Sequence, residues 1–116
     1  MNSASMISGL APAFYTVALD GIAKEALTRG LSEPDAMLLA AQALKGTAEM
    51  ILSRKEDNKG LFAVDEVRDQ AIASSTGSGA RGVVVLRRAD VKDSFAEAMS
   101  QGMEKRDADG YLYSNW

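Results

Sequence analysis

Residues 36–52 constrain the fold of this chain more than any other segment, because their pattern is helical and apolar on nearly every side. The apolar side chains of this segment include Met37, Leu38, Leu39, Ala40, Ala41, Ala43, Leu44, Ala48, Met50, Ile51 and Leu52. A helix with such a distribution is buried on most of its surface. A domain of 116 residues has too few other elements to surround it. We therefore expect a second chain to cover this helix.

The segments before this helix give its boundaries. A first helix is predicted from Pro12, because proline is tolerated in a first turn, to Gly30, a residue type that commonly closes helices. Ser32 is placed to cap the second helix, which then runs to about Ser53. Residues 1–9 hold small and polar side chains and are predicted to be a lead-in.

The second half of the chain predicts three more helices. A short third helix is followed, after a loop, by residues 83–86, Val-Val-Val-Leu, which have the highest strand propensity in the chain. No second strand pattern exists to pair with them, so we favour a helix here. Asp90 and Asp93 are typical of an N-cap and N3 pair that opens a last helix. The prediction is an all-α domain of five helices over residues 10–106, with a tail at residues 107–116.

The composition excludes several classes of site and partner. Without cysteine or histidine, the chain offers no disulfide, zinc site or imidazole base, and no metal site is expected. The net charge of -3 provides no basic field for nucleic acid. No secretory signal is visible, and Gln42, Lys45 and Glu49 interrupt the most apolar window, which argues against a membrane span. We expect a cytoplasmic protein with no nucleic-acid or membrane partner.

Residues 74–82 are the one stretch rich in glycine and hydroxyl side chains, and they spell G-x-G-x-x-G through Gly77, Gly79 and Gly82. A dinucleotide-binding loop of this pattern needs a strand before it and a helix at its end. Here a helical pattern precedes the loop, so a connection between helices is the better interpretation. Its hydroxyl and N–H groups either hold a carboxylate or phosphate, or only cap the helix that starts near Arg81.

Four side chains are candidates for catalysis if the chain is an enzyme. Thr76, Ser78 and Arg81 belong to the loop and its flank, and Tyr15 in the first helix offers a hydroxyl as proton donor. Each has a structural alternative, because hydroxyls cap helices, arginines form surface ion pairs and tyrosines pack. The residues alone leave both interpretations open.

The order of these features resembles the C-terminal dimerisation domain of pyrroline-5-carboxylate reductase over roughly residues 8–105. That family opens the domain with Ser-Gly-Ser-Gly-Pro-Ala-aromatic, and this chain has Ser8-Gly9-Leu10-Ala11-Pro12-Ala13-Phe14. The similarity continues through Gly30-Leu31, the alanine-rich residues 38–46 and the Arg68-Asp69 pair before the loop.

The resemblance implies an all-α domain whose long helices interlock with those of a second copy, in an intertwined homodimer or a higher homo-oligomer. The dimer interface is then expected to include Phe14, Leu38, Leu39, Leu44 and Ile51. In the family, the loop after the Arg-Asp pair holds the carboxylate and ring nitrogen of pyrroline-5-carboxylate. The residues that resemble it, and that we expect to bind a small acid or imine, are Ser75, Thr76, Gly77, Ser78 and Gly79.

Family members also carry an N-terminal Rossmann domain that binds NADPH for the reduction to proline. This sequence begins almost where that domain would end, so we expect no cofactor in this chain and no reductase activity by itself. The loop lacks the family's Pro-Gly-Gly-Thr-Thr core, and Leu10 and Ala11 replace a serine and a glycine. These departures leave an alternative: a stand-alone, cofactor-free cyclase, isomerase or lyase that reuses the inter-subunit pocket, with Tyr15, Thr76, Ser78 and Arg81 as its first candidates.

Overall fold

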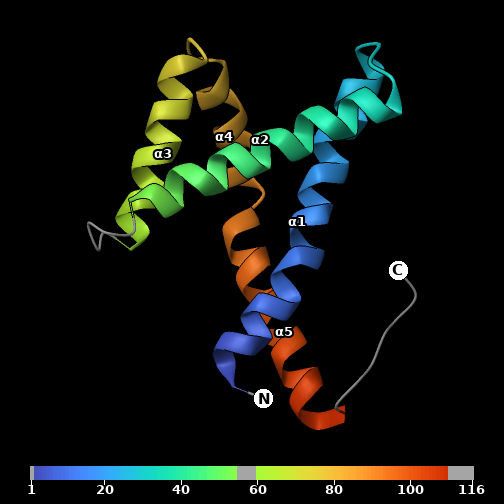
Figure 1. Ribbon diagram of the computed structural model, residues 1–116, viewed down its shortest axis with the longest axis vertical. Coiled ribbons are helices and arrows are strands. Elements are labelled where there is room, and N and C mark those ends of the chain that lie inside the picture. The colour runs from blue at the N-terminus through green and yellow to red at the C-terminus, as the bar shows by residue number, and fades with distance from the viewer. Residues whose placement is uncertain (1, 55–59, 110–116) are drawn as a thin grey trace. The chain divides into compact units, whose positions relative to one another are not determined.

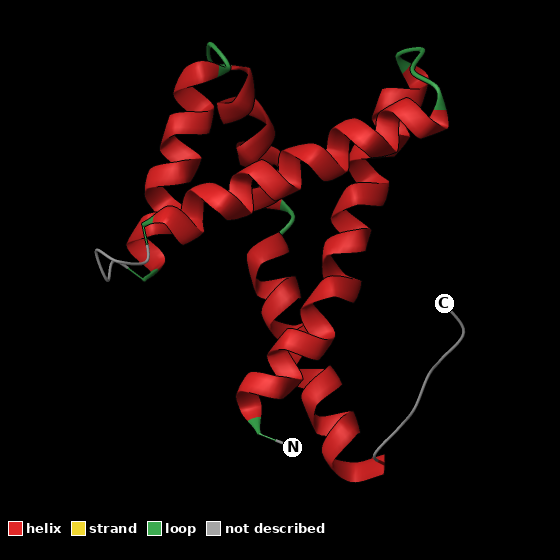
Figure 2. Ribbon diagram, in the orientation of Figure 1, coloured by secondary structure: helices red, strands yellow, loops and turns green. Residues whose placement is uncertain are grey.

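The computed structural model describes residues 2–54 and 60–109, which form five α-helices (Figures 1 and 2). The helices are α1 (Ser3–Thr28), α2 (Glu33–Ser53), α3 (Leu61–Ser74), α4 (Ser78–Arg88) and α5 (Val91–Asp109). Residues 2–54 and 60–109 contain no strand. The predicted all-α class is confirmed, and so is a helix over the valine-rich residues 83–86.

The predicted start of the first helix is wrong, because α1 begins at Ser3 rather than near Pro12. The side-chain oxygen of Asn2 accepts a hydrogen bond from the Ser5 N–H over 2.8 Å, which satisfies one donor of the first helical turn. Pro12 therefore lies inside α1, where it lacks the N–H that an interior residue normally donates. The last helix likewise extends into the predicted tail. The domain boundaries at residues 10 and 106 stay predictions.

The chain divides into two compact units, of which one comprises residues 19–85. In this unit the turn between α1 and α2 is formed as expected: Gly30 has a φ of 97°, and the Ser32 hydroxyl accepts a hydrogen bond from the Asp35 N–H. The buried side chains of the unit are small, namely Ala23, Ala36, Ala40, Ala63 and Val67. Alanine buries little apolar area, so this core contributes little free energy to folding.

Arg54 at the end of α2 ties this helix to α3. Its guanidinium donates hydrogen bonds to the Met50 carbonyl over 2.9 Å and to the Gln70 side-chain oxygen over 3.0 Å. The same group lies 3.3 Å from a carboxylate oxygen of Glu66. Only 20% of the Arg54 side chain is exposed, so these charge-assisted bonds are partly shielded from water. They hold the end of α2 against the polar edge of α3.

The other unit comprises residues 1–18 and 86–116, and its helices approach closely at one glycine. A methyl group at Gly102 of α5 would lie 3.1 Å from the nearest methyl carbon of Leu10 on α1. Met6 is buried in the same unit. Asp90, the residue that precedes α5, has a φ of 53°, and its carbonyl accepts a hydrogen bond from the Ser94 N–H. A glycine at residue 102 thus permits this close contact between α1 and α5.

Within the described ranges, α1 is long and apolar enough to cross a membrane by length and composition. The sequence window considered above for such a role was in α2, whereas α1 is the helix that reaches the required hydropathy. Core helices of soluble proteins satisfy the same test. The expected absence of a membrane partner stays a prediction.

Candidate functional site

The serine- and glycine-rich loop is a tight turn between α3 and α4. Ser75 follows α3, and its N–H donates to the carbonyls of Ala71 and Ile72, each over 3.2 Å. Thr76 and Gly77 then take positive φ values of 53° and 93°, which reverses the chain direction. α4 begins at the next residue, three residues earlier than the predicted start near Arg81.

The Ser75 hydroxyl links the two helices that meet at this turn. It donates a hydrogen bond to the Ile72 carbonyl in the last turn of α3, over 2.8 Å. It also accepts one from the Gly79 N–H in the first turn of α4, over 2.8 Å. One side chain therefore gives the Ile72 carbonyl of one helix a second hydrogen bond and satisfies an orphan donor of the next helix.

Gly79 is required by this arrangement. A methyl group there would lie 2.6 Å from the Ser75 hydroxyl oxygen and 3.4 Å from the Ile72 Cα. The backbone of α4 approaches α3 closely only because residue 79 has no side chain. The second glycine of the G-x-G-x-x-G pattern thus has a packing role.

Most hydrogen-bond donors of the α3–α4 turn have acceptors within the turn or in the helices that flank it. In the first turn of α4, the N–H groups of Ser78, Gly79 and Arg81 donate to the Ser75 carbonyl, the Ser75 hydroxyl and the Gly77 carbonyl. The Ser74 and Thr76 hydroxyls donate to backbone carbonyls over 3.1 and 2.7 Å. In the single chain, the geometry therefore favours helix capping rather than carboxylate binding as the role of these hydroxyl and N–H groups.

The four catalytic candidates are divided between the two compact units. Thr76, Ser78 and Arg81 are exposed along the turn and the start of α4. Tyr15 belongs to the other compact unit, where 53% of the residue is exposed. Arg68, which precedes Asp69 in the sequence pair noted above, donates to an Asp65 carboxylate oxygen over 2.9 Å within α3. The structure thus brings three of the candidates to one exposed turn and shows no buried acid or base among them.

The same turn does not fit a dinucleotide. The element before it is α3, not a strand, and the third glycine of the pattern, Gly82, lies inside α4. A pyrophosphate needs free N–H groups at the helix N-terminus, and here most of them already have acceptors. No chemical step through NADPH is assigned to these residues.

α2 exposes its largest side chains. Leu38 and Leu39 are 64% and 60% exposed and Leu44 is 37% exposed, whereas only Ala36 and Ala40 of this helix are buried among the described residues. Met37, Met50 and Leu52 are exposed as well. Large exposed apolar side chains gathered on one helix are typical of a protein–protein contact. Sequence reasoning expected three of these leucines in an interface.

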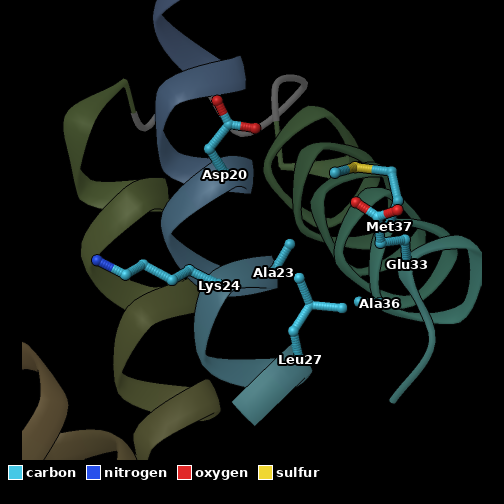
Figure 3. Close-up of a pocket in the computed structure, with 7 residues that line it drawn as sticks. All are labelled: Asp20, Ala23, Lys24, Leu27, Glu33, Ala36 and Met37. Carbon is cyan, nitrogen blue, oxygen red and sulfur yellow. The ribbon is translucent and has the colours of Figure 1, made fainter. Parts of the chain in front are cut away.

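Side chains of α1 and α2 line a groove that the sequence did not suggest. It has a volume of about 320 Å³ and is lined by Asp20, Ala23, Lys24, Leu27, Glu33, Ala36 and Met37. Figure 3 shows Leu27 pointing from α1 toward α2, while the Lys24 ammonium extends away from α2. Its lining is mainly apolar and includes two carboxylates, those of Asp20 and Glu33. None of the predicted site residues lines this groove.

The comparison with known families identifies the family to which the chain belongs. The sequence model of the family described as "Pyrroline-5-carboxylate reductase dimerisation" matches residues 1–108. The chain belongs to this family. The resemblance drawn from the opening segment, the alanine-rich helix and the loop is therefore confirmed, and the chain is a pyrroline-5-carboxylate reductase dimerisation domain.

Curated relatives of this dimerisation domain include pyrroline-5-carboxylate reductases of Methanosarcina acetivorans, 28% identical over 90% of the chain, and of Escherichia coli, 29% identical over 85% of it. A third is the delta-1-pyrroline-5-carboxylate reductase kk1I of Curvularia clavata, 30% identical over 80% of the chain. The chain covers 36%, 34% and 27% of the lengths of these three proteins. No solved structure matches the chain significantly.

Proposed function

We propose that this dimerisation domain forms a homodimer in which α2 is the main buried element. The observation that supports this most directly is the exposure of Leu38 and Leu39 on a helix that is apolar nearly all round, in a chain whose family is defined by dimerisation. A core made mainly of alanine leaves a single chain short of buried area. A second copy supplies the buried apolar area that the single chain lacks.

The experiment that tests the homodimer is sedimentation equilibrium of the chain, combined with thermal unfolding at several protein concentrations. A dimer that folds as it associates has twice the 12.3 kDa mass of one chain, and its melting temperature rises with concentration. A monomer of unchanging melting temperature from 1 to about 100 μM would contradict the proposal.

We also propose that the domain acts in a pyrroline-5-carboxylate reductase context, in the cytoplasm and in proline biosynthesis, and that it does not reduce a substrate by itself. Support comes from the printed names of the relatives and from the poor fit of the α3–α4 turn to a dinucleotide. Reduction then requires a nicotinamide-binding domain in addition to these residues. Incubation of the chain with NADPH and pyrroline-5-carboxylate is expected to leave the absorbance at 340 nm unchanged.

Binding of a small acid or imine by Ser75, Thr76, Gly77, Ser78 and Gly79 remains a proposal for the assembled dimer. The donors of this turn are largely used in the single chain, so binding depends on groups from a partner copy. The cofactor-free cyclase, isomerase or lyase is not favoured, because the family and its relatives carry reductase names.

A further inference from the structure

α4 exposes an apolar strip with an arginine at each end. Arg81, Val84, Val85 and Arg88 stand at positions i, i+3, i+4 and i+7 of one uninterrupted helix, so they share one face. Val84 and Val85 are 42% and 61% exposed, and both arginines are exposed. Neither arginine forms an ion pair with another described residue. We call these four residues the α4 strip.

The groove between α1 and α2 has the complementary character. Leu27, Ala36 and Met37 make it apolar, and Asp20 and Glu33 add two carboxylates to its lining (Figure 3). Neither carboxylate forms an ion pair within residues 2–54 and 60–109. Lys24 is the one basic side chain along the lining, and its ammonium extends away from α2.

The α4 strip also agrees in length with the α1 side of the groove. Residues 20 and 27 lie two helical turns apart on α1, and so do residues 81 and 88 on α4. At a rise of about 1.5 Å per residue, each pair spans about 10 Å along its helix. An α4 strip laid along this stretch of α1 would therefore extend from Asp20 to Leu27, with its two valines between its arginines.

We infer that the α4 strip of one copy docks into the α1–α2 groove of a second copy. This inference rests on the proposed homodimer and adds the register of one of its contacts. The valines bury apolar area against Leu27 and Met37. The arginines pair with Asp20 and Glu33, which would otherwise remain unpaired acids beside an apolar surface. Two copies related by a two-fold axis make this contact twice.

The charge pairing allows a test by complementation. One variant carries Arg81→Glu and Arg88→Glu, and a second carries Asp20→Lys and Glu33→Lys. Each variant alone sets like charges against each other at both contacts, and we expect its self-association to be at least about tenfold weaker than that of the parent chain. An equimolar mixture restores opposite charges at both contacts and is expected to associate within about threefold of the parent. Arg87→Glu, an exposed arginine outside the strip, is the matched control and is expected to leave association unchanged.

Sedimentation velocity at low salt measures association, and circular dichroism checks that each variant keeps its helices. If either variant fails to fold, Arg81→Gln with Arg88→Gln and Asp20→Asn with Glu33→Gln replace the reversals, and each neutral pair is expected to weaken association and its salt dependence. A parent that dimerises with variants that associate equally well would overturn the docking while leaving the homodimer intact, and the groove would then be open to another ligand. The docking would also be overturned if both charge-reversal variants fold, dissociate when alone and fail to associate in the equimolar mixture. A monomeric parent would instead contradict the proposed function.

Discussion

α2 and the α3–α4 turn belong to the same compact unit. They differ in how many of their hydrogen-bonding and apolar groups are paired or buried within a single chain. The turn uses its own groups: the Ser75 hydroxyl bonds both helices, and most N–H groups at the start of α4 have acceptors. α2 buries two alanines and leaves its leucines exposed. The difference teaches where a partner acts, since a surface gains from association only what the isolated chain has left unburied or unpaired.

The largest expected effect on association comes from a charge placed on the exposed apolar surface of α2. Leu44→Asp puts a carboxylate where Leu44, 37% exposed in the single chain, is expected to become buried in the dimer. Loss of one interface anchor of this size costs about 2–4 kcal/mol of association free energy, and the buried charge adds to that. We expect the dimer to dissociate and its helical circular dichroism to fall at micromolar concentration.

Gln42→Asp is the matched control for Leu44→Asp. Gln42, Lys45 and Glu49 lie along one stripe of α2, and all three are exposed. The same charge there is expected to change association by less than about 0.5 kcal/mol. A folded Leu44→Asp monomer as stable as the parent would remove the basis for α2 as the stabilising element.

A smaller effect, on the free energy of unfolding, is expected at the α3–α4 turn. Gly79→Ala forces the Ser75 hydroxyl away from its two partners, at a cost of about 1–3 kcal/mol in unfolding free energy, measured by urea denaturation. Gly82→Ala in the same helix meets open space and is expected to stabilise by about 0.5–1 kcal/mol. In a Ser75→Ala background the cost of Gly79→Ala should fall, because the clashing oxygen is gone. An undiminished cost there would show that the oxygen is not the obstacle.

The tie between α2 and α3 ranks next. Arg54→Met removes the bonds to the Met50 carbonyl and Gln70 and the ion pair with Glu66, and we expect a loss of about 1–2 kcal/mol in urea unfolding. Arg68→Met removes only the pair with Asp65 inside α3 and should cost less than about 0.5 kcal/mol. Equal losses for the two variants would contradict an inter-helix role for Arg54.

The smallest effect concerns Glu25 in the last turns of α1. The hydrogen bond from Arg29, 2.8 Å long, lowers the pKa of the Glu25 carboxyl from its ordinary value, and a further hydrogen bond from Thr28 acts in the same direction. A carboxyl whose pKa is lower in the folded chain stabilises it above the unfolded pKa, and this contribution is lost as pH falls through the folded value. Carbon-detected NMR titration should give Glu25 a pKa below that of an ordinary glutamate, and this pKa should rise in Arg29→Gln. A midpoint unaffected by that change would exclude Arg29 as the cause.

Features encoded by neighbouring residues were predictable. Gly30 and Ser32 mark the α1–α2 turn because a left-handed glycine and a capping hydroxyl act within a few residues. The apolar circumference of α2 was visible for the same reason. The helical state of the valine run followed from the lack of a second strand, since a lone strand cannot pair its backbone groups.

Features that depend on the position of a single oxygen or on distant residues were not predictable. The start of α1 depends on the Asn2 side chain, a signal present in the sequence but outweighed by Pro12. The tie from Arg54 to Gln70 crosses sixteen positions of the chain. The Ser75 hydroxyl was placed among candidate binding groups, and only its orientation in space reveals that both its hydrogen-bonding roles are filled within the turn.

The core of small side chains has a consequence for the time course of folding. A chain that buries mostly alanines gains little by collapsing alone, so under the proposed homodimer the productive event is the encounter of two chains. Refolding from urea should then be second order at low concentration, with an initial rate that grows as the square of the protein concentration. The rate at which the chain is produced would thereby set how quickly it becomes structured.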